Sequence, residues 1–363
     1  MQTSRQIFEN VQKKISQKER ITSDEALALF DFNDLISLGK LANQVRETLH
    51  SNKTYYIVNR HIDYSNICAI KCKFCAFARK KGEEGSFEFT IDDIVSRVLQ
   101  GLKVGITEIH MVGGFHPTHS FDFYLETLRA VKKVAPKLHI KAFTAAEIRY
   151  FSKKFRKTEE KVLEELKNAG LDSLPGGGAE IFDPEIRKKI CGPKGPAHYW
   201  LDTHKRAHAL GFKSTATMLY GHIETAQNRV NHMEAIRNLQ DESGGFMCFI
   251  PLAFNPKGTE FESKGYTSGI DDLKTLAIAR IFFDNIKHIK AYWIMSGVEM
   301  AQLAQHFGAD DLHGTVMEEN ITHMAGGRAP VMLLEANLHR LIREAGRIPI
   351  QRDSLYNTVR SFN

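Results

Sequence analysis

The sequence predicts an α/β protein built as a closed or nearly closed (β/α)8 barrel of the TIM type. Eight apolar, β-rich segments alternate with segments of helical periodicity across residues 51–314. The connections are short, and no linker rich in Pro, Gly or Ser interrupts the alternation. Regular alternation of strands and helices favours a parallel sheet, and eight units suffice to close a barrel. An open doubly wound sheet is the alternative.

Residues 1–50 are expected to form an N-terminal helical extension. Ile7 and Val11 lie on one apolar stripe at helical spacing. Residues 22–25 supply capping side chains for a second helix, and a third is expected over residues 32–49. This extension carries no group of catalytic side chains, so we expect it to pack on the barrel.

The barrel strands are the segments rich in β-branched and aromatic residues. We expect them over residues 55–59, 106–112, 138–144, 171–174, 213–219, 246–254, 289–295 and 310–314. The helices between them are expected over residues 91–102, 121–134, 159–169, 200–210, 225–240, 271–285 and 298–307. Residues 315–363 should form a C-terminal tail with one helix, over residues 334–344, packed on the barrel.

Three cysteines follow the first strand with CxxxCxxC spacing. They are Cys68, Cys72 and Cys75, with the aromatic Phe74 inside the motif. Thiolates on so short a loop can converge on one metal centre, and soft sulfur ligands suit iron–sulfur clusters. Three ligands leave one iron of a four-iron cluster open, as a catalytic site requires. Zinc with His61 as a fourth ligand, a disulfide and inert core thiols are the alternatives.

The composition excludes several classes of function. The formal charge of +6 is spread over mixed acidic and basic residues, which does not resemble a nucleic-acid footprint. No apolar run approaches the roughly 18 residues of a membrane span. The first twenty residues lack the apolar segment of a signal peptide. Five cysteines, three of them clustered, favour a reducing cytoplasm.

The residues after each strand are the ones to inspect, because ligands bind over the carboxyl ends of parallel barrel strands. Gly113 and Gly114 follow the second strand and would let a ligand approach the backbone closely. Glu180 follows the Gly-rich residues 176–178, and Glu147 follows the third strand. Either carboxylate could accept hydrogen bonds from the hydroxyls of a ribose. The alternative for both is an ion pair inside the barrel mouth.

Three further residues are candidates for catalysis or for binding an acidic substrate. His222 follows the fifth strand and could donate to a carboxylate or pass a proton. Arg60 and His61 precede the cysteines and could pair with a substrate carboxylate. Residues 292–295 supply an aromatic wall or a platform for the substrate, and residues 313–315 are expected to help close the mouth of the barrel.

The cysteine motif with its aromatic residue resembles that of the radical S-adenosylmethionine (radical SAM) superfamily. In that superfamily SAM chelates the open iron, and an electron from the cluster releases a 5′-deoxyadenosyl radical. The resemblance implies that Cys68, Cys72 and Cys75 hold a [4Fe–4S] cluster. It also implies that Gly113 and Gly114 contact the amino group of SAM, and that an outside one-electron donor is needed.

Longer segments resemble one branch of the superfamily, which holds the menaquinone enzymes of the futalosine pathway and the deazaflavin (F420) synthases. These segments are residues 66–77, 176–183, 217–225, 239–246, 249–254 and 308–312. Within the branch, residues 218–222, 290–294 and 311–315 are similar to the aminofutalosine synthase family.

This resemblance implies a specific reaction. The 5′-deoxyadenosyl radical adds to 3-[(1-carboxyvinyl)oxy]benzoate, and rearrangement with loss of a carboxylate gives 6-amino-6-deoxyfutalosine, methionine and bicarbonate. The two substrate carboxylates would then meet Arg60, His61 or His222. The sister dehypoxanthine futalosine cyclase and the F420-synthase-like enzymes remain alternatives. A zinc-binding barrel without redox chemistry is the alternative from another class.

Overall fold

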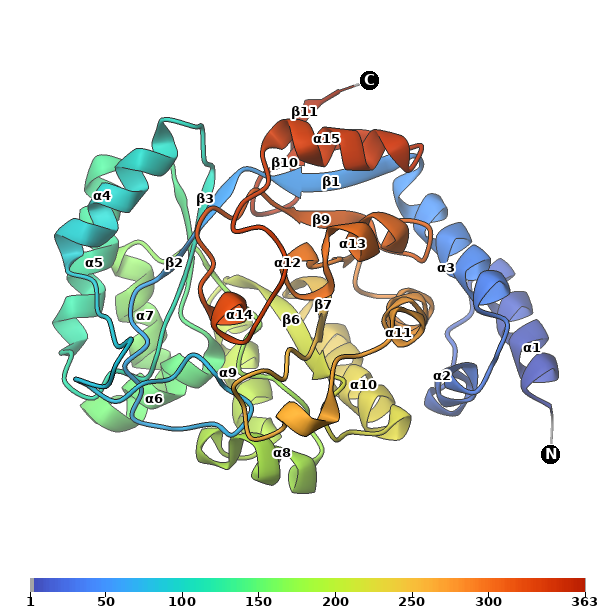
Figure 1. Cartoon of the computed structure of the whole chain (residues 1–363), viewed down its shortest axis with the longest axis horizontal. Coiled ribbons are helices and arrows are strands. Elements are labelled where there is room, and N and C mark those ends of the chain that lie inside the picture. Colours follow the sequence, from blue (N-terminus) through green and yellow to red (C-terminus); the bar gives the residue numbers. More distant parts are fainter. Residues whose placement is uncertain (1–2, 363) are drawn as a thin grey trace.

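The computed structural model describes residues 3–362, in which a curled parallel sheet is surrounded by helices (Figure 1). Seven strands form this sheet in chain order, and each pair of neighbours is parallel. The strands are β2 (Asn59–Asp63), β3 (Glu108–Val112), β4 (His139–Ala142), β5 (Ser173–Leu174), β6 (Lys213–Tyr220), β7 (Phe246–Ala253) and β8 (His288–Ile289).

A second sheet, in the order β11-β10-β1-β9, completes the ring. Its strand β1 (Lys53–Ile57) is separated from β2 by one residue, Val58. Strand β9 (Asp311–Gly314) pairs in parallel with β1, and a bridge between Lys290 and Asp311 joins β9 to the segment that follows β8. If β1 and β2 are taken as one interrupted strand, eight parallel strands surround the core, as the sequence predicted.

The connecting helices cover the outside of the sheet (Figure 1). Several begin at a Thr or Ser whose side chain accepts a backbone N–H of the first turn, including Thr90, Thr144 and Thr225. The helices are α4 (Ile91–Leu102), α5 (Phe121–Val134), α6 (Ala145–Phe155), α7 (Glu159–Ala169), α8 (Pro184–Cys191), α9 (Ala197–Ala209), α10 (Ala226–Ser243), α11 (Gly269–Phe282), α12 (Trp293–Ser296) and α13 (Val298–Ala304). Helices α6 and α8 were not expected from the sequence.

The seventh barrel strand is shorter than predicted. Residues 289–295 were expected to be extended, but β8 ends at Ile289 and helix α12 begins at Trp293. The helical turn buries both Trp293 and Ile294, and the Trp293 indole N–H donates to the Gly314 carbonyl at 3.0 Å. An apolar run of this length fits a strand or a buried helical turn equally well, and packing decides between them.

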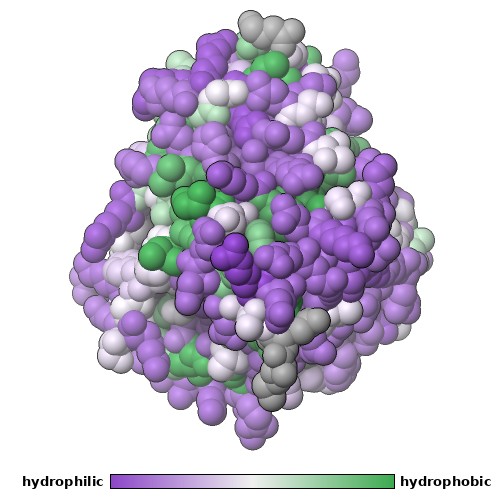
Figure 2. All heavy atoms as spheres, turned by 90° about the vertical axis from the view of Figure 1, so that its right-hand side faces the viewer, coloured by the Kyte–Doolittle hydropathy of each residue, from purple (hydrophilic) through white to green (hydrophobic). Residues whose placement is uncertain are grey.

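The N-terminal helices α1 (Ser4–Ser16), α2 (Ser23–Phe30) and α3 (Leu35–His50) lie along one side of the barrel. Helix α2 packs on α10 and α11, and α3 packs on α11. The face that carries this extension is mostly hydrophilic, with scattered hydrophobic side chains (Figure 2). The apolar side chains of the extension therefore pack against the barrel helices.

The C-terminal tail contains more than the one helix predicted. Besides α14 (Ile321–Met324) and α15 (Glu335–Glu344), it forms a hairpin of β10 (Ile348–Arg352) and β11 (Thr358–Ser361). Strand β10 adds in parallel to β1. A proline at position 349, inside β10, is an unfavourable signal for a strand. Among residues 3–362, no helix is both long enough and apolar enough to cross a membrane.

Candidate active site

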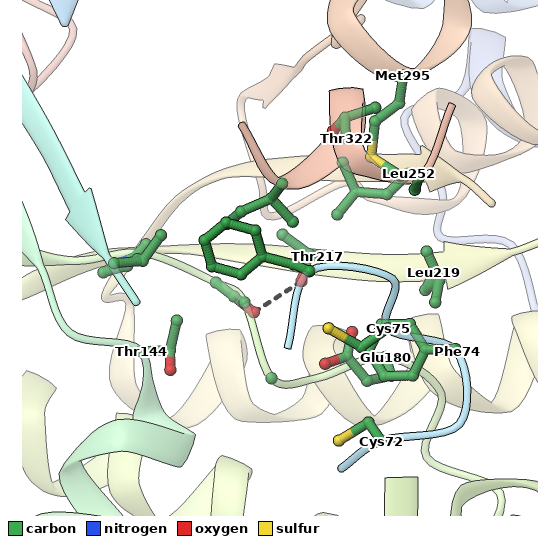
Figure 3. A pocket seen from close by; sticks show the side chains of 18 of the residues that line it. Cys72, Phe74, Cys75, Thr144, Glu180, Thr217, Leu219, Leu252, Met295 and Thr322 are labelled. Carbon is green, nitrogen blue, oxygen red and sulfur yellow. Dashed lines mark hydrogen bonds between the residues drawn. The ribbon is translucent and has the colours of Figure 1, made fainter. Parts of the chain in front are cut away.

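A cavity of about 300 Å³ opens at the carboxyl ends of the barrel strands (Figure 3). Loops after the strands and the first turn of α6 supply its cysteines, glycines and carboxylates, whereas the strands supply its floor and part of its wall. One wall is apolar and includes Leu219, Leu252, Phe254 and Met295. This arrangement places a polar rim and floor beside a surface suited to an aromatic ligand.

All three motif cysteines line the cavity. Their loop follows β2 and is held by backbone hydrogen bonds, from Cys68 N to the Arg79 carbonyl at 3.0 Å and from Lys73 N to the Ile190 carbonyl at 2.9 Å. The Cys68 sulfur also accepts the N–H of Phe115 at 3.4 Å. The loop is therefore fixed to α8 and to the end of β3, which keeps three sulfurs on one side of the cavity.

The spread of these sulfurs bears on the kind of metal centre they could hold. As a group, the three cysteine sulfurs do not lie within 4.8 Å of one another. A tetrahedral zinc ion with bonds of about 2.3 Å needs its sulfurs about 3.8 Å apart. A multi-iron cluster does not require its ligands to meet at one metal ion, and thiolates are the type of ligand that such clusters use. Burial raises the pKa of the Cys72 thiol to about 12, so metal binding there would displace a proton.

Gly113 and Gly114 line the cavity, and both are constrained by close packing. A Cβ at Gly114 would lie 2.4 Å from the Ile67 carbonyl oxygen, and a Cβ at Gly113 would lie 2.6 Å from the Tyr64 ring. The two glycines therefore let β3 approach the start of the cysteine loop, in addition to exposing backbone to the cavity. This packing requirement was not foreseen from the sequence.

We expect Gly114→Ala to displace the cysteine loop, because a backbone carbonyl cannot swing aside as a side chain can. The free energy of unfolding should fall by about 1–3 kcal/mol, and the reconstituted protein should bind iron substoichiometrically. Iron analysis and a denaturant titration measure both effects. Gly192→Ala is the control, since a Cβ there meets nothing within 4 Å. Full iron content in the Gly114 variant would contradict this role.

Glu147 lines the cavity, but its carboxylate is already engaged. One oxygen accepts the Thr144 N–H at 2.7 Å, and the other accepts the Tyr64 hydroxyl at 2.9 Å and the Gly113 N–H at 3.3 Å. Burial raises the pKa of Glu147 to about 7 in spite of these bonds. The residue opens helix α6 through a capping box and holds Gly113 in place, which leaves it less free than expected to bind a ribose.

Glu180 lines the cavity in an ion pair with Lys194, a residue that the sequence gave no reason to select. Glu180 follows the Gly-rich turn of residues 176–178, and its backbone has a left-handed conformation with a φ of 48°. Lys194 also lines the cavity, with its ammonium 5.2 Å from the centre of the Phe74 ring inside the cysteine motif. The pair therefore sets two opposite charges beside the cysteine loop, where both ends of an amino acid could be recognised.

Two of the three predicted catalytic residues do not line the cavity. The Arg60 guanidinium turns away to Glu318 at 2.5 Å and to Gln100 at 3.2 Å. His222 lies over the end of β6, where its ring contacts Glu224 at 3.0 Å and the Leu219 carbonyl at 3.1 Å. The structure therefore does not place Arg60 or His222 among the residues that line the cavity, and a role for either in binding the substrate stays a prediction. His61 does line the cavity.

The floor of the cavity contains His110, which the sequence analysis did not consider, and His313, which was expected at the mouth of the barrel but lies on β9. His61 lies 2.9 Å from His313, between their Nε2 atoms, and its ring stacks on His110 with centroids 4.6 Å apart. All three rings line the cavity. Burial lowers the pKa of His61 to about 3 and also lowers those of His110 and His313. These rings are therefore neutral donors and acceptors at physiological pH.

Comparison with known proteins places this architecture in a family. Residues 62–236 match the radical SAM superfamily model, and residues 243–362 match the CofH/MqnC C-terminal region. An aminodeoxyfutalosine synthase of Thermus thermophilus is 47% identical over 97% of this chain and 96% of its own length. A 5-amino-6-(D-ribitylamino)uracil–L-tyrosine 4-hydroxyphenyl transferase of Archaeoglobus fulgidus is 42% identical over 88% of this chain and 93% of its own.

A solved structure shows the same fold at much lower sequence identity. The FeFe-hydrogenase maturase HydG of Carboxydothermus hydrogenoformans superposes with a TM-score of 0.75 at 18% identity, covering 97% of this chain and 81% of that chain. The cavity, the cysteine loop and the curled parallel sheet agree with this kinship. The chain thus belongs to the radical SAM superfamily of enzymes, which use a [4Fe–4S] cluster and SAM.

Proposed function

We propose that this enzyme catalyses the aminodeoxyfutalosine synthase reaction of menaquinone biosynthesis. The observation that carries the proposal is where the distinguishing sequence segments lie. Residues 290–294 and 311–315, which resemble the aminofutalosine synthase family, supply Tyr292 and His313 to the cavity. The residues that set this family apart are thus the residues that a second substrate would meet beside SAM.

The chain offers a place for each part of the reaction. We propose Cys68, Cys72 and Cys75, which all line the cavity, as the cluster ligands. When bound, the cluster and SAM supply a 5′-deoxyadenosyl group in radical form. Gly113 and the Glu180–Lys194 pair lie beside the cysteine loop, where SAM would be held.

The overall change is a transfer. The C5′–S bond of SAM breaks and releases methionine, and C5′ bonds to the vinyl carbon of 3-[(1-carboxyvinyl)oxy]benzoate. The arene migrates and one carboxylate leaves as CO2, which returns the electron used to break the C5′–S bond. Hydration of the CO2 by one water outside the cavity gives bicarbonate and a proton, and the organic product is 6-amino-6-deoxyfutalosine. The apolar wall of Leu219, Leu252 and Phe254 would orient the arene and exclude water from the reacting carbons. An external one-electron donor is needed to reduce the cluster. The free cysteines of the described chain favour the cytoplasm as the location of the enzyme.

Anaerobic incubation of the reconstituted enzyme with SAM, a reductant and the enolpyruvyl benzoate tests the proposal. Mass spectrometry should find the adenosine adduct and methionine in equal amounts. Parallel incubations supply the substrates of the two related activities, dehypoxanthine futalosine for the cyclase, and tyrosine with 5-amino-6-(D-ribitylamino)uracil for the transferase. Turnover of either of these, with no adduct from the enolpyruvyl benzoate, would refute the proposed reaction.

A further inference from the structure

The deepest part of the cavity lies on the strands rather than on the loops. His61 is on β2, His110 on β3 and His313 on β9, whereas the cysteines follow β2 by five residues or more. A ligand group that reaches these rings has therefore passed the level at which the loops hold SAM. The floor is thus available to the far end of a second substrate.

Lys290 stands behind this floor without a carboxylate partner. It follows β8, is 1% exposed, and places its ammonium 3.2 Å from Nδ1 of His313. Within residues 3–362 no carboxylate oxygen lies within 4.0 Å of that ammonium, whereas the neighbouring Lys141 pairs with Glu108 at 2.7 Å. Burying an ammonium without a counter-charge is costly. An ammonium without a carboxylate partner beside the cavity floor therefore points to an anionic ligand that supplies the counter-charge.

The hydrogen bonds from Lys290 have one consistent direction. An ammonium can only donate, so Nδ1 of His313 accepts. The proton of the neutral His313 ring is then on Nε2, which donates to Nε2 of His61 at 2.9 Å. His61 in turn carries its proton on Nδ1. This series of hydrogen bonds therefore leaves the Nδ1–H of His61 as a donor on a ring that lines the cavity. The positive charge of Lys290 lies behind that donor, beyond His313.

The negative groups of the cavity do not cancel this charge. Glu147, Glu180 and Glu319 come from loops or the helix after the strands, and each already accepts hydrogen bonds, from Thr144, Lys194 and Thr322 respectively. Asp63, at the end of β2, accepts the backbone N–H of Asn320. The carboxylates thus belong to the rim, and the floor retains an excess of positive charge.

We propose that the Lys290–His313–His61 chain is the binding site for the benzoate carboxylate of the substrate. The assignment rests on the proposed function for the identity of the substrate. The vinyl group has to lie near the SAM held by the loops, so the group that reaches the strands is at the other end of the molecule, on the arene. His61 touches the carboxylate, and Lys290 is a positioning residue that supplies charge through His313. The incoming anion gives the buried ammonium its counter-charge.

Binding of small aromatic acids tests this site without turnover. Calorimetry compares 3-methoxybenzoate with the neutral 3-methoxybenzamide on reconstituted wild-type enzyme and on Lys290→Met. The wild type should prefer the carboxylate by about 10- to 100-fold, the range of a hydrogen bond to a charged group. Lys290→Met should lose that preference while folding normally, as circular dichroism and thermal melting will show. Lys205→Met, on α9 and outside the cavity lining, is the control and should keep it.

Kinetics then separate this site from the proposed reaction. With the enolpyruvyl benzoate, Lys290→Met should raise KM and leave reductive cleavage of SAM unchanged, and adding His61→Leu should cost little more because the two residues act as one unit. A wild-type enzyme without preference for the carboxylate, or a Lys290 variant that keeps the preference, overturns the site. Carboxylate preference without any adenosine adduct would overturn the proposed function and leave the site standing.

Discussion

Replacing any one of Cys68, Cys72 and Cys75 by alanine is expected to abolish turnover. Each of the three cysteines lines the cavity, and the loop that carries them is fixed by hydrogen bonds to α8 and to the segment after β3. With two thiolates left, a four-iron cluster lacks the ligands to stay bound. Product formation and reductive SAM cleavage should both fall below detection.

Iron and sulfide analysis of anaerobically reconstituted protein, with electron paramagnetic resonance after reduction, reads out the cluster directly. Cys248→Ala is the matched control, because Cys248 is a buried, unpaired cysteine on β7 that does not line the cavity. That variant should retain its iron and its activity. Wild-type iron content in any of the three motif variants would remove the basis for treating these residues as ligands.

Asp310→Asn is expected to cause the largest loss of stability in the molecule, about 3–5 kcal/mol. Asp310 is fully buried beside the seam between β8 and β9. It pairs with the buried Arg280, contacts Nδ1 of His288 at 2.6 Å, and accepts the Ile289 N–H at 2.8 Å. Removing its charge leaves the Arg280 guanidinium buried without a counter-ion. Denaturant unfolding followed by circular dichroism measures the change.

The pH dependence gives an independent check. Burial alone would raise the pKa of Asp310, but His288, His50 and Arg280 lower it below the ordinary value. The stability that this carboxylate contributes is therefore complete above its unfolded pKa of about 3.9 and is lost as the pH falls through the folded value. The difference in the free energy of unfolding between wild type and Asp310→Asn should therefore become smaller at acidic pH. Glu344→Gln, which breaks the exposed pair with Arg340, should change the free energy of unfolding little at any pH.

The eight barrel strands could be predicted from the sequence because each is a compact apolar segment between turns and helices. The place of the cysteines in the cavity could be predicted for a similar reason, since all three lie within eight residues of the chain. Where a structural element depends on distant packing, prediction was weaker. Residues 293–296 became a helical turn because the barrel buries them, and β10 forms only because β1 offers it an edge.

The carboxylate-binding residues show the same limit. Arg60, His61 and His222 were reasonable candidates because they flank strand ends, but which side of a strand a residue faces decides its role. Arg60 faces the helices and meets Glu318, while the next residue, His61, faces the cavity. Lys290 and His313 become a pair only when β8 and β9 are set side by side. A single sequence without relatives contains no signal for that contact.

Strand β10 pairs with β1, and Lys53 lies opposite Ile348. The outer edge of β1 is therefore covered only by β10, one of the last strands along the sequence. For most of translation that edge has no partner, because β10 is synthesised long after β1. Such an exposed edge attracts other unfinished chains. A truncation that removes β10 should therefore leave the edge of β1 open and promote aggregation, although β10 does not line the cavity.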